Sequence, residues 1–345
     1  MATRDHPEDR QIDRERHGDP RPVEASGGAG RGGPGAGAGS PREIPAAGWK
    51  AIALRTFGEI GRDRVMLVAA GVAFYGLLAL VPALAAFIAI YGLVFEAEQI
   101  RQQIGMLEGF LPGGGMEILR TQIDRLLEQS TGTLGIALAV SVAISLWSAN
   151  AAMKSLFEAM NVACEEFETR GFVRLTLTTL AFTLGAMLSV AALMVAMVGL
   201  PALAAAIDLG PAVDWLIRIG SFAAMVLLLF LGVGLLYRYG PARAPARWRW
   251  VTPGAIVAVV AAILASALFS WYTANFGSYN ATYGSLGAII GFMTWLWIVT
   301  IVIIVGAELD SEMEHQTARD TTTGPAEPIG RRGATVADRV APPRG

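Results

Sequence analysis

Long stretches without any charged side chain constrain this sequence more than any other feature. They run over Val65–Phe95, Gln129–Met153, Leu175–Ile207, Ile219–Tyr237 and Val251–Ala307. A charge at the centre of a bilayer costs at least about 2.5 kcal/mol, so segments that cross a membrane exclude charges. A spanning helix needs roughly 20 apolar residues. The first four stretches therefore predict one membrane-spanning helix each.

The last stretch is too long for a single spanning helix. It is interrupted at Asn275–Gly284, a polar and aromatic segment without charge that is typical of a tight turn between two helices. We therefore predict an all-α integral membrane protein with about six transmembrane helices in a membrane domain over residues 46–315. The predicted spans lie near residues 66–94, 132–153, 175–200, 215–237, 252–274 and 284–307.

Lysines and arginines between the predicted spans indicate the orientation, because they are enriched in cytoplasmic loops. One side carries basic clusters over residues 50–64, 154–174 and 238–249, whereas the other side carries a longer acidic loop and an uncharged turn. The basic side is therefore predicted to be the cytoplasm. An even number of spans then places both termini there, in a multi-pass protein of a bacterial inner (plasma) membrane.

Both ends of the chain are polar. Residues 1–45 nearly lack large apolar side chains, and residues 316–345 combine prolines with scattered charges. Such segments cannot bury enough apolar surface to offset the entropy lost on ordering. We predict disordered cytoplasmic tails over residues 1–45 and 316–345.

A short amphipathic helix is predicted just before the first span. Its apolar residues recur at helical spacing and its charged residues lie elsewhere around the helix, which is typical of a helix on the membrane surface. The apolar set is Trp49, Ile52, Ala53, Thr56, Phe57 and Ile60, and the charged set is Lys50, Arg55, Glu59 and Arg62.

A polar stripe leaves the second predicted span. Its members, at helical spacing, are Asn150, Lys154, Glu158, Asn161 and Glu165. One interpretation is the wall of a hydrophilic path or headgroup groove. The other is a helix that leaves the membrane, with Lys154 extending to the interface and the asparagines binding neighbouring helices. The sequence favours the second for Lys154 and Glu158, and leaves both open for Asn150 and Asn161.

Further polar candidates lie at the ends of the last span. Asn280 and Tyr283 belong to the break at Asn275–Gly284, which either lines a cavity or forms an interfacial turn in an aromatic belt. Glu308 is the first charge after the last span, and it either pairs with an arginine or a lipid headgroup or reaches water at the helix end. Composition favours the structural alternative at both places.

A basic, aromatic elbow follows the fourth predicted span. Its arginines are Arg238, Arg243, Arg247 and Arg249, beside Trp248 and Trp250. Such a segment suits anionic lipid headgroups. It serves equally well as a topology anchor, and the sequence does not separate these roles.

The sequence predicts no catalytic site, no metal site and no cofactor. Cys164 is the only cysteine, and His6, His17 and His315 lie in polar flanks. Phosphate-loop, zinc-protease and serine-hydrolase patterns do not occur. A net charge of −2 at pH 7, without a basic stripe interleaved with aromatics, argues against nucleic acid as a partner.

Four motifs, which follow one another along the chain, resemble the YihY/BrkB family of bacterial inner-membrane proteins over roughly residues 45–315. They are Ala69-Ala-Gly-Val-Ala-Phe-Tyr75 with Leu77–Pro82, Trp147-Ser-Ala-Asn150 with Ala159-Met-Asn161, Leu236-Tyr-Arg-Tyr-Gly-Pro241 with Trp250–Gly254, and Tyr279–Gly287 with Gly306-Ala-Glu308. Ala79 stands where the family usually has serine, so any role of that hydroxyl is absent here.

The resemblance implies a six-helix membrane fold but defines the activity only loosely. Members carry virulence-factor names, and some carry a ribonuclease name that we interpret as a misattribution. We expect a non-enzymatic protein with a transport or envelope-maintenance role and a lipid-like or amphiphilic substrate. The alternative is a non-transporting scaffold for envelope assembly, and a ribonuclease ranks last. The expected partners are the lipid bilayer and anionic lipid, and glycine spacing permits a homo-oligomer.

Overall fold

The computed structural model divides the chain into two units, Met1–Arg31 and Gly32–Gly345. The residues that it describes all belong to the second unit and are 33–91, 120, 124, 136–196, 200–201, 210–276 and 285–342. The first 32 residues of the predicted N-terminal tail, and residues 277–284 of the predicted break, among them Asn280 and Tyr283, lie outside these ranges.

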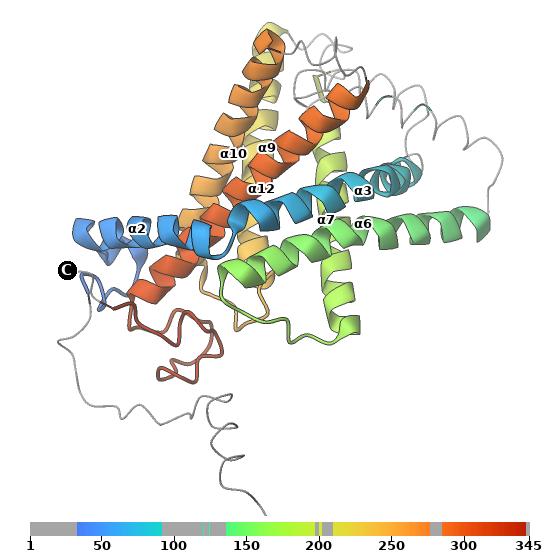
Figure 1. Cartoon of the computed structure of the whole chain (residues 1–345). Coiled ribbons are helices and arrows are strands. Elements are labelled where there is room, and N and C mark those ends of the chain that lie inside the picture. Colours follow the sequence, from blue (N-terminus) through green and yellow to red (C-terminus); the bar gives the residue numbers. More distant parts are fainter. Residues whose placement is uncertain are drawn as a thin grey trace, which may run out of the picture. The chain divides into compact units, whose positions relative to one another are not determined.

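Helices make up most of the described part (Figure 1). A 3-10 turn, η1, precedes seven α-helices. In order they are η1 Pro41–Glu43, α2 Ala46–Arg62, α3 Val65–Tyr91, α6 Ile136–Ala163, α7 Phe172–Met194, α9 Pro211–Tyr239, α10 Trp248–Phe276 and α12 Ser285–Gln316. One helix lies in each of the six predicted span ranges. A helix satisfies its own backbone polar groups, which is a requirement for a segment in lipid.

Four helices of the described part are long and apolar enough to cross a membrane. They are residues Phe172–Met194, Trp215–Tyr239, Trp248–Asn275 and Ile289–Gln316. A fifth is counted if α2 and the start of α3, which are bent by 62° relative to each other, form one span. Membrane-capable helices are thereby established, whereas the count of six stays a prediction.

Local sequence explains the bounds of α9. Gly210 has φ of +80°, which glycine tolerates, and Pro211 at the first helical position lacks only an N–H that would have no helical partner. At the other end, the Gly240 N–H still bonds to the Leu236 carbonyl at 2.7 Å, and Pro241 stops the helix.

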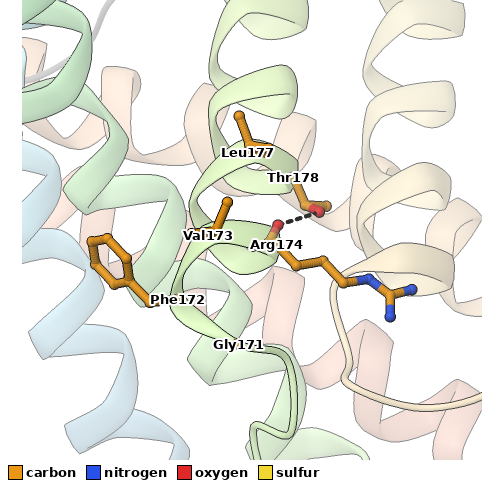
Figure 2. A pocket seen from close by; sticks show the side chains of 6 residues that line it. All are labelled: Gly171, Phe172, Val173, Arg174, Leu177 and Thr178. Carbon is orange, nitrogen blue, oxygen red and sulfur yellow. Dashed lines mark hydrogen bonds between the residues drawn. The ribbon is translucent and has the colours of Figure 1, made fainter.

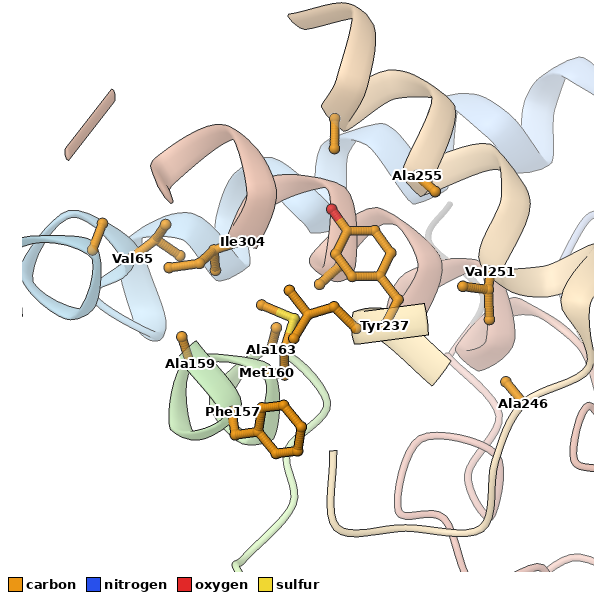
Figure 3. Close-up of a cluster of buried hydrophobic side chains, with 14 residues drawn as sticks. Val65, Phe157, Ala159, Met160, Ala163, Tyr237, Ala246, Val251, Ala255 and Ile304 are labelled. Atoms are coloured by element: carbon orange, nitrogen blue, oxygen red, sulfur yellow. The ribbon is translucent and has the colours of Figure 1, made fainter. Parts of the chain in front are cut away.

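The last helix, α12, packs against α3, α10, α2 and α6. The buried core between the helices includes Phe157 and Met160 from α6, Tyr237 from α9 and Ile304 from α12 (Figure 3). The Tyr237 hydroxyl donates to the Ile303 carbonyl at 2.5 Å, so its polar end is satisfied inside this core.

Helices α10 and α12 approach each other closely at Gly254 and Gly306. A Cβ atom at Gly254 would collide with the Gly306 carbonyl and the Asp310 carboxylate. A Cβ at Gly306 would collide with the Tyr237 hydroxyl. Glycine is therefore required at both positions to let the two backbones meet.

The face that α2 buries differs from the predicted apolar one. The structure buries Ile52 and Thr56 but also Arg55 and Glu59, whereas Phe57 is 78% exposed. The reason is that α12 continues to Gln316, beyond the predicted span end at residue 307. Arg55 Nε donates to Glu312 Oε2, and its Nη2 donates to Gln316 Oε1 at 2.6 Å.

The segment after α12 corrects the prediction of a disordered tail over residues 316–345. Residue 316 is helical, and residues 317–342 are held by hydrogen bonds. The Arg332 guanidinium donates to the carbonyls of Ala318 and Ala337 at 2.6 and 2.7 Å. The Thr335 N–H donates to Glu166 Oε1 at 2.6 Å. A polar segment becomes ordered here because its backbone groups find partners in charged side chains.

Candidate functional site

The polar stripe of α6 faces a row of threonines on α7. Asn150 is 2% exposed, and its Oδ1 accepts a hydrogen bond from Thr183 Oγ1 at 3.3 Å. Lys154 Nζ donates to Thr176 Oγ1 at 2.9 Å. It also lies 5.3 and 5.0 Å from the ring centroids of Trp147 and Phe172, within cation–π range. Asn150 and Lys154 therefore both bind side chains of the neighbouring helix α7.

The C-terminal end of the stripe binds loops rather than a helix. Asn161 is 1% exposed, accepts the Ala242 N–H at 2.7 Å and donates to Glu168 Oε2 at 3.1 Å. Because α6 ends at Ala163, Glu165 leaves the stripe; it has φ of +52° and pairs with Arg339 at 3.3 Å. Glu158 is exposed.

Arg170 completes this connection between the α6–α7 loop and the elbow after α9. Its guanidinium pairs with Glu168 at 2.7 Å and donates to the carbonyls of Gly240 and Tyr239 at 2.6 and 3.1 Å. The Arg170 side chain holds the pKa of Glu168 down at about 2 through these hydrogen bonds. Glu168 is therefore ionised at neutral pH.

The four arginines of the elbow have different environments. Arg238 lies over the rings of Trp248 and Tyr239, at 5.0 and 5.3 Å. Arg243 forms a buried ion pair with Glu314 at 2.6 Å, and Arg247 donates to the Thr322 carbonyl at 2.8 Å. Arg249 is exposed. Of these four, only Arg238 and Arg243 line a cavity between the start of α7 and the elbow.

A cavity of about 460 Å³, which we call the arginine pocket, lies between the start of α7 and the elbow. It is bounded on one side by Gly333 of the C-terminal segment, whose carbonyl accepts the Ala244 N–H at 2.8 Å. Four arginines line it, and among its described lining residues there is no carboxylate. Those arginines are Arg170, Arg174, Arg238 and Arg243.

Arg243, which lines this pocket, has buried donors without a partner in the described structure. Its side chain is 2% exposed and its Nη2 binds Glu314, yet its Nε and Nη1 are buried without a hydrogen-bond partner in the described structure. Burial disfavours its charged form, but the Glu314 carboxylate more than offsets this and raises the pKa of the guanidinium. A cation with unsatisfied donors favours an anion nearby.

An apolar groove of about 560 Å³ adjoins the arginine pocket on α7. The two share Arg174 and Thr178, and the groove also takes in Phe172, Val173 and Leu177. Figure 2 shows Phe172 and Arg174 leaving the first turn of α7 in opposite directions. The first turn of α7 thus has an apolar side and a basic side.

Carboxylates cluster on the last three turns of α12. Glu308 is 1% exposed, and its Oε1 is buried without a hydrogen-bond partner in the described structure. Asp310 Oδ1 accepts the Gly254 N–H at 2.7 Å, and Glu314 Oε2 accepts Thr321 Oγ1 at 2.6 Å. Glu308 is not at a helix end in water, because α12 continues to Gln316. In the described ranges no three His, Cys, Asp or Glu side chains are placed so that they could hold a metal ion.

Neither Arg170 nor Arg174 was among the residues predicted for a site. The sequence signal for these two arginines is the basic cluster over residues 154–174, which by itself indicates only the orientation of the chain in the membrane. The sequence could not reveal that this cluster faces the elbow. That juxtaposition depends on Asn161 and Arg170, which bind backbone groups that follow some 70 to 80 residues later.

Comparisons with known proteins agree with the motifs. A sequence model of the family described as virulence factor BrkB matches residues 56–330. The putative ribonuclease-like protein YfkH of Bacillus subtilis is 28% identical over 212 residues, which cover 60% of this chain and 76% of that protein. No solved structure matches.

Relatives named UPF0761 membrane protein occur in Xanthomonas campestris strains B100 and 8004. Each is 26% identical over 260 residues, which cover 73% of this chain. The match spans 58% of the length of these relatives, so they extend beyond the part they share with this chain.

Proposed function

The chain belongs to the BrkB virulence factor family, whose sequence model covers residues 56–330, and on this premise we propose a transport or envelope-maintenance role with an amphiphilic, lipid-like substrate. The supporting observation is the arginine pocket, which adjoins an apolar groove on a membrane-capable helix. A site that offers both kinds of surface suits a molecule with an anionic end and an apolar body.

The proposed topology has six spans in a bacterial inner membrane. To the four membrane-capable helices it adds α3 and α6, which are 27 and 28 residues long. The helix α2 would lie at the interface with Leu54 and Phe57, which are 55% and 78% exposed, toward lipid. Both termini would then be cytoplasmic, together with the basic loops.

A scaffold that moves no substrate is the second candidate. The polar stripe favours it, because Asn150 and Lys154 bind threonines of α7 and Asn161 binds the elbow. Asparagine and threonine hydrogen bonds of this kind join helices in membranes. In this alternative the stripe stabilises the bundle and no polar path follows it.

We do not extend the ribonuclease-like name of the Bacillus relative to this chain. The described lining of the arginine pocket includes no histidine or carboxylate to act as a general base. The proposal is therefore non-enzymatic and includes no nucleic-acid partner, no cofactor and no metal.

Transfer in reconstituted vesicles tests the proposed role. The full chain would be placed in phosphatidylcholine vesicles with a trace of fluorescent phosphatidylglycerol, and movement between leaflets would be followed by dithionite quenching. We expect the wild type to accelerate movement and the double variant R174A/R238A to lose most of the acceleration. The matched control is R42A/R331A, which removes two exposed arginines outside the pocket.

The outcomes separate the two candidates. Acceleration that survives in the control and falls in R174A/R238A supports the amphiphile-handling role. A correctly folded wild type that leaves the movement of the lipid unchanged would favour the scaffold.

A further inference from the structure

We propose that the arginine pocket and the apolar groove form one site for a phosphate-bearing lipid, with the phosphate among the arginines and an acyl chain along α7. This inference rests on the proposed amphiphile-handling role and specifies the chemistry of the ligand. Three observations carry it: the charge balance of the pocket, the start of α7, and the continuity of the groove.

The charge balance of the pocket leaves room for an anion. Arg170 is neutralised by Glu168 and Arg243 by Glu314, at 2.7 and 2.6 Å. Arg174 and Arg238 add two further positive charges to the lining. Arg243 Nε and Nη1 and Arg238 Nε are buried and have no hydrogen-bond partner in the described structure. A phosphate in the pocket would offer acceptor oxygens to the guanidinium groups that line it.

The start of α7 adds to this positive potential. The helix begins at Phe172, and its N-cap residue, Gly171, offers no side chain to bind the first backbone N–H groups. The positive end of the α7 dipole therefore lies at the groove, whose lining includes Gly171 and Phe172, and in the sequence it falls between Arg170 and Arg174 of the pocket lining. Anions are stabilised at such positions when side-chain donors are also present.

The groove distinguishes a lipid from a free phosphate. Phe172, Val173 and Leu177 are 66%, 68% and 62% exposed on α7. Arg174 and Thr178 line both cavities, so an anion bound in the pocket would have its apolar part beside these side chains. Free phosphate gains nothing from that surface, whereas an acyl chain packs against it and stays out of water.

Titration calorimetry on the purified full chain in a neutral detergent tests the proposal. The probes are short-chain phosphatidylglycerol, short-chain phosphatidylcholine and inorganic phosphate. The variants are R174A/R238A for the pocket, F172S/L177S for the groove and R42A/R331A as the charge-matched control. Arg243 is left intact, because its removal would strand the buried Glu314 carboxylate. Thermal midpoints are measured for each variant to exclude unfolding.

We expect phosphatidylglycerol to bind the wild type and the control equally, and to bind R174A/R238A about tenfold more weakly or worse. The groove variant should weaken binding of the lipid but leave that of inorganic phosphate unchanged. Equal affinity for inorganic phosphate and phosphatidylglycerol, insensitive to F172S/L177S, would assign the pocket to free phosphate and overturn the lipid site. Unchanged binding in folded R174A/R238A would overturn the site altogether.

Comparison with the transfer assay keeps the two proposals apart. Binding that depends on the arginines without any lipid movement would leave the site in place and remove the transport role. Lipid movement that R174A/R238A does not impair would retain the role and remove this site.

Discussion

Asn161 Oδ1 accepts a 2.7 Å hydrogen bond from the backbone N–H of Ala242, and this bond joins the end of α6 to the elbow between α9 and α10. The same side chain donates to Glu168 at 3.1 Å. One buried amide therefore positions both loops that line the arginine pocket.

Replacement of Asn161 by leucine should destabilise the protein by about 1–3 kcal/mol, because the Ala242 N–H and the Glu168 carboxylate lose their partner. Thermal unfolding in detergent and abundance in the membrane measure the effect. The control is N275L, at an exposed asparagine that bonds within its own helix. Normal abundance of N161L with complete loss of function would instead assign Asn161 to a substrate path.

Gly306→Ala should cost about 1–3 kcal/mol of stability, because the added methyl group collides with the Tyr237 hydroxyl of α9 and with Ala258 and the Gly254 carbonyl of α10. Gly232→Ala is the matched control, since a Cβ there meets nothing within 4 Å. Alanine favours helix over glycine, so the control should be neutral or slightly stabilising. Equal thermal midpoints for the two variants would contradict the close packing at Gly306.

Arg55→Ala should destabilise the protein by about 3–5 kcal/mol, because it removes the guanidinium from the buried Glu312 carboxylate and leaves only His315, at 3.8 Å, as a basic neighbour. Arg62→Ala should change stability by at most about 1 kcal/mol, since the Arg62 side chain is 62% exposed. The apolar double variant R55M/E312M should recover much of the loss. Denaturant titration of the three variants measures these differences, and a similar cost for R55A and R62A would refute the buried pair.

The pH dependence of stability should include a contribution from Glu168. Arg170 holds the pKa of this carboxyl at about 2, whereas the unfolded chain has a value of about 4.3. A depressed folded-state pKa gives stability that is complete above about pH 4.3 and is lost as the pH falls toward 2. The thermal unfolding midpoint of E168Q should therefore fall less steeply than that of the wild type as the pH is lowered from 5 to 2. Parallel curves would rule out this contribution.

Cys164 should resist maleimide at neutral pH in the native protein. Its side chain is buried, and burial raises the pKa of the thiol to about 12, so little reactive thiolate forms. Labelling should appear after denaturation. In a C164S background, a cysteine at the 87% exposed Phe167 should react readily, and from the cytoplasmic side only if the proposed topology holds. Rapid labelling of native Cys164 would mean that this loop opens.

The helices themselves follow from local sequence. Charge-free stretches of sufficient length must satisfy their backbone groups internally in lipid, and helices do this without any distant partner. The proline–glycine signals at Pro211 and Gly240 likewise act within a few residues. The family motifs indicated the family, which the sequence-model match over residues 56–330 confirms.

The partners of the polar side chains were decided by the tertiary structure alone. Helical spacing placed Arg55 on the charged face of α2, but its partner Glu312 is 257 residues away and α12 extends further than hydropathy indicated. The arginine pocket likewise needs the loops after α6 and α9 and the segment near Gly333 to meet. Polar composition favoured disorder after residue 316, yet Arg332 and Glu166 supply hydrogen bonds that order this segment. Helix formation needs only neighbours along the chain, whereas ion pairs and pockets depend on the distances between segments that only packing brings together.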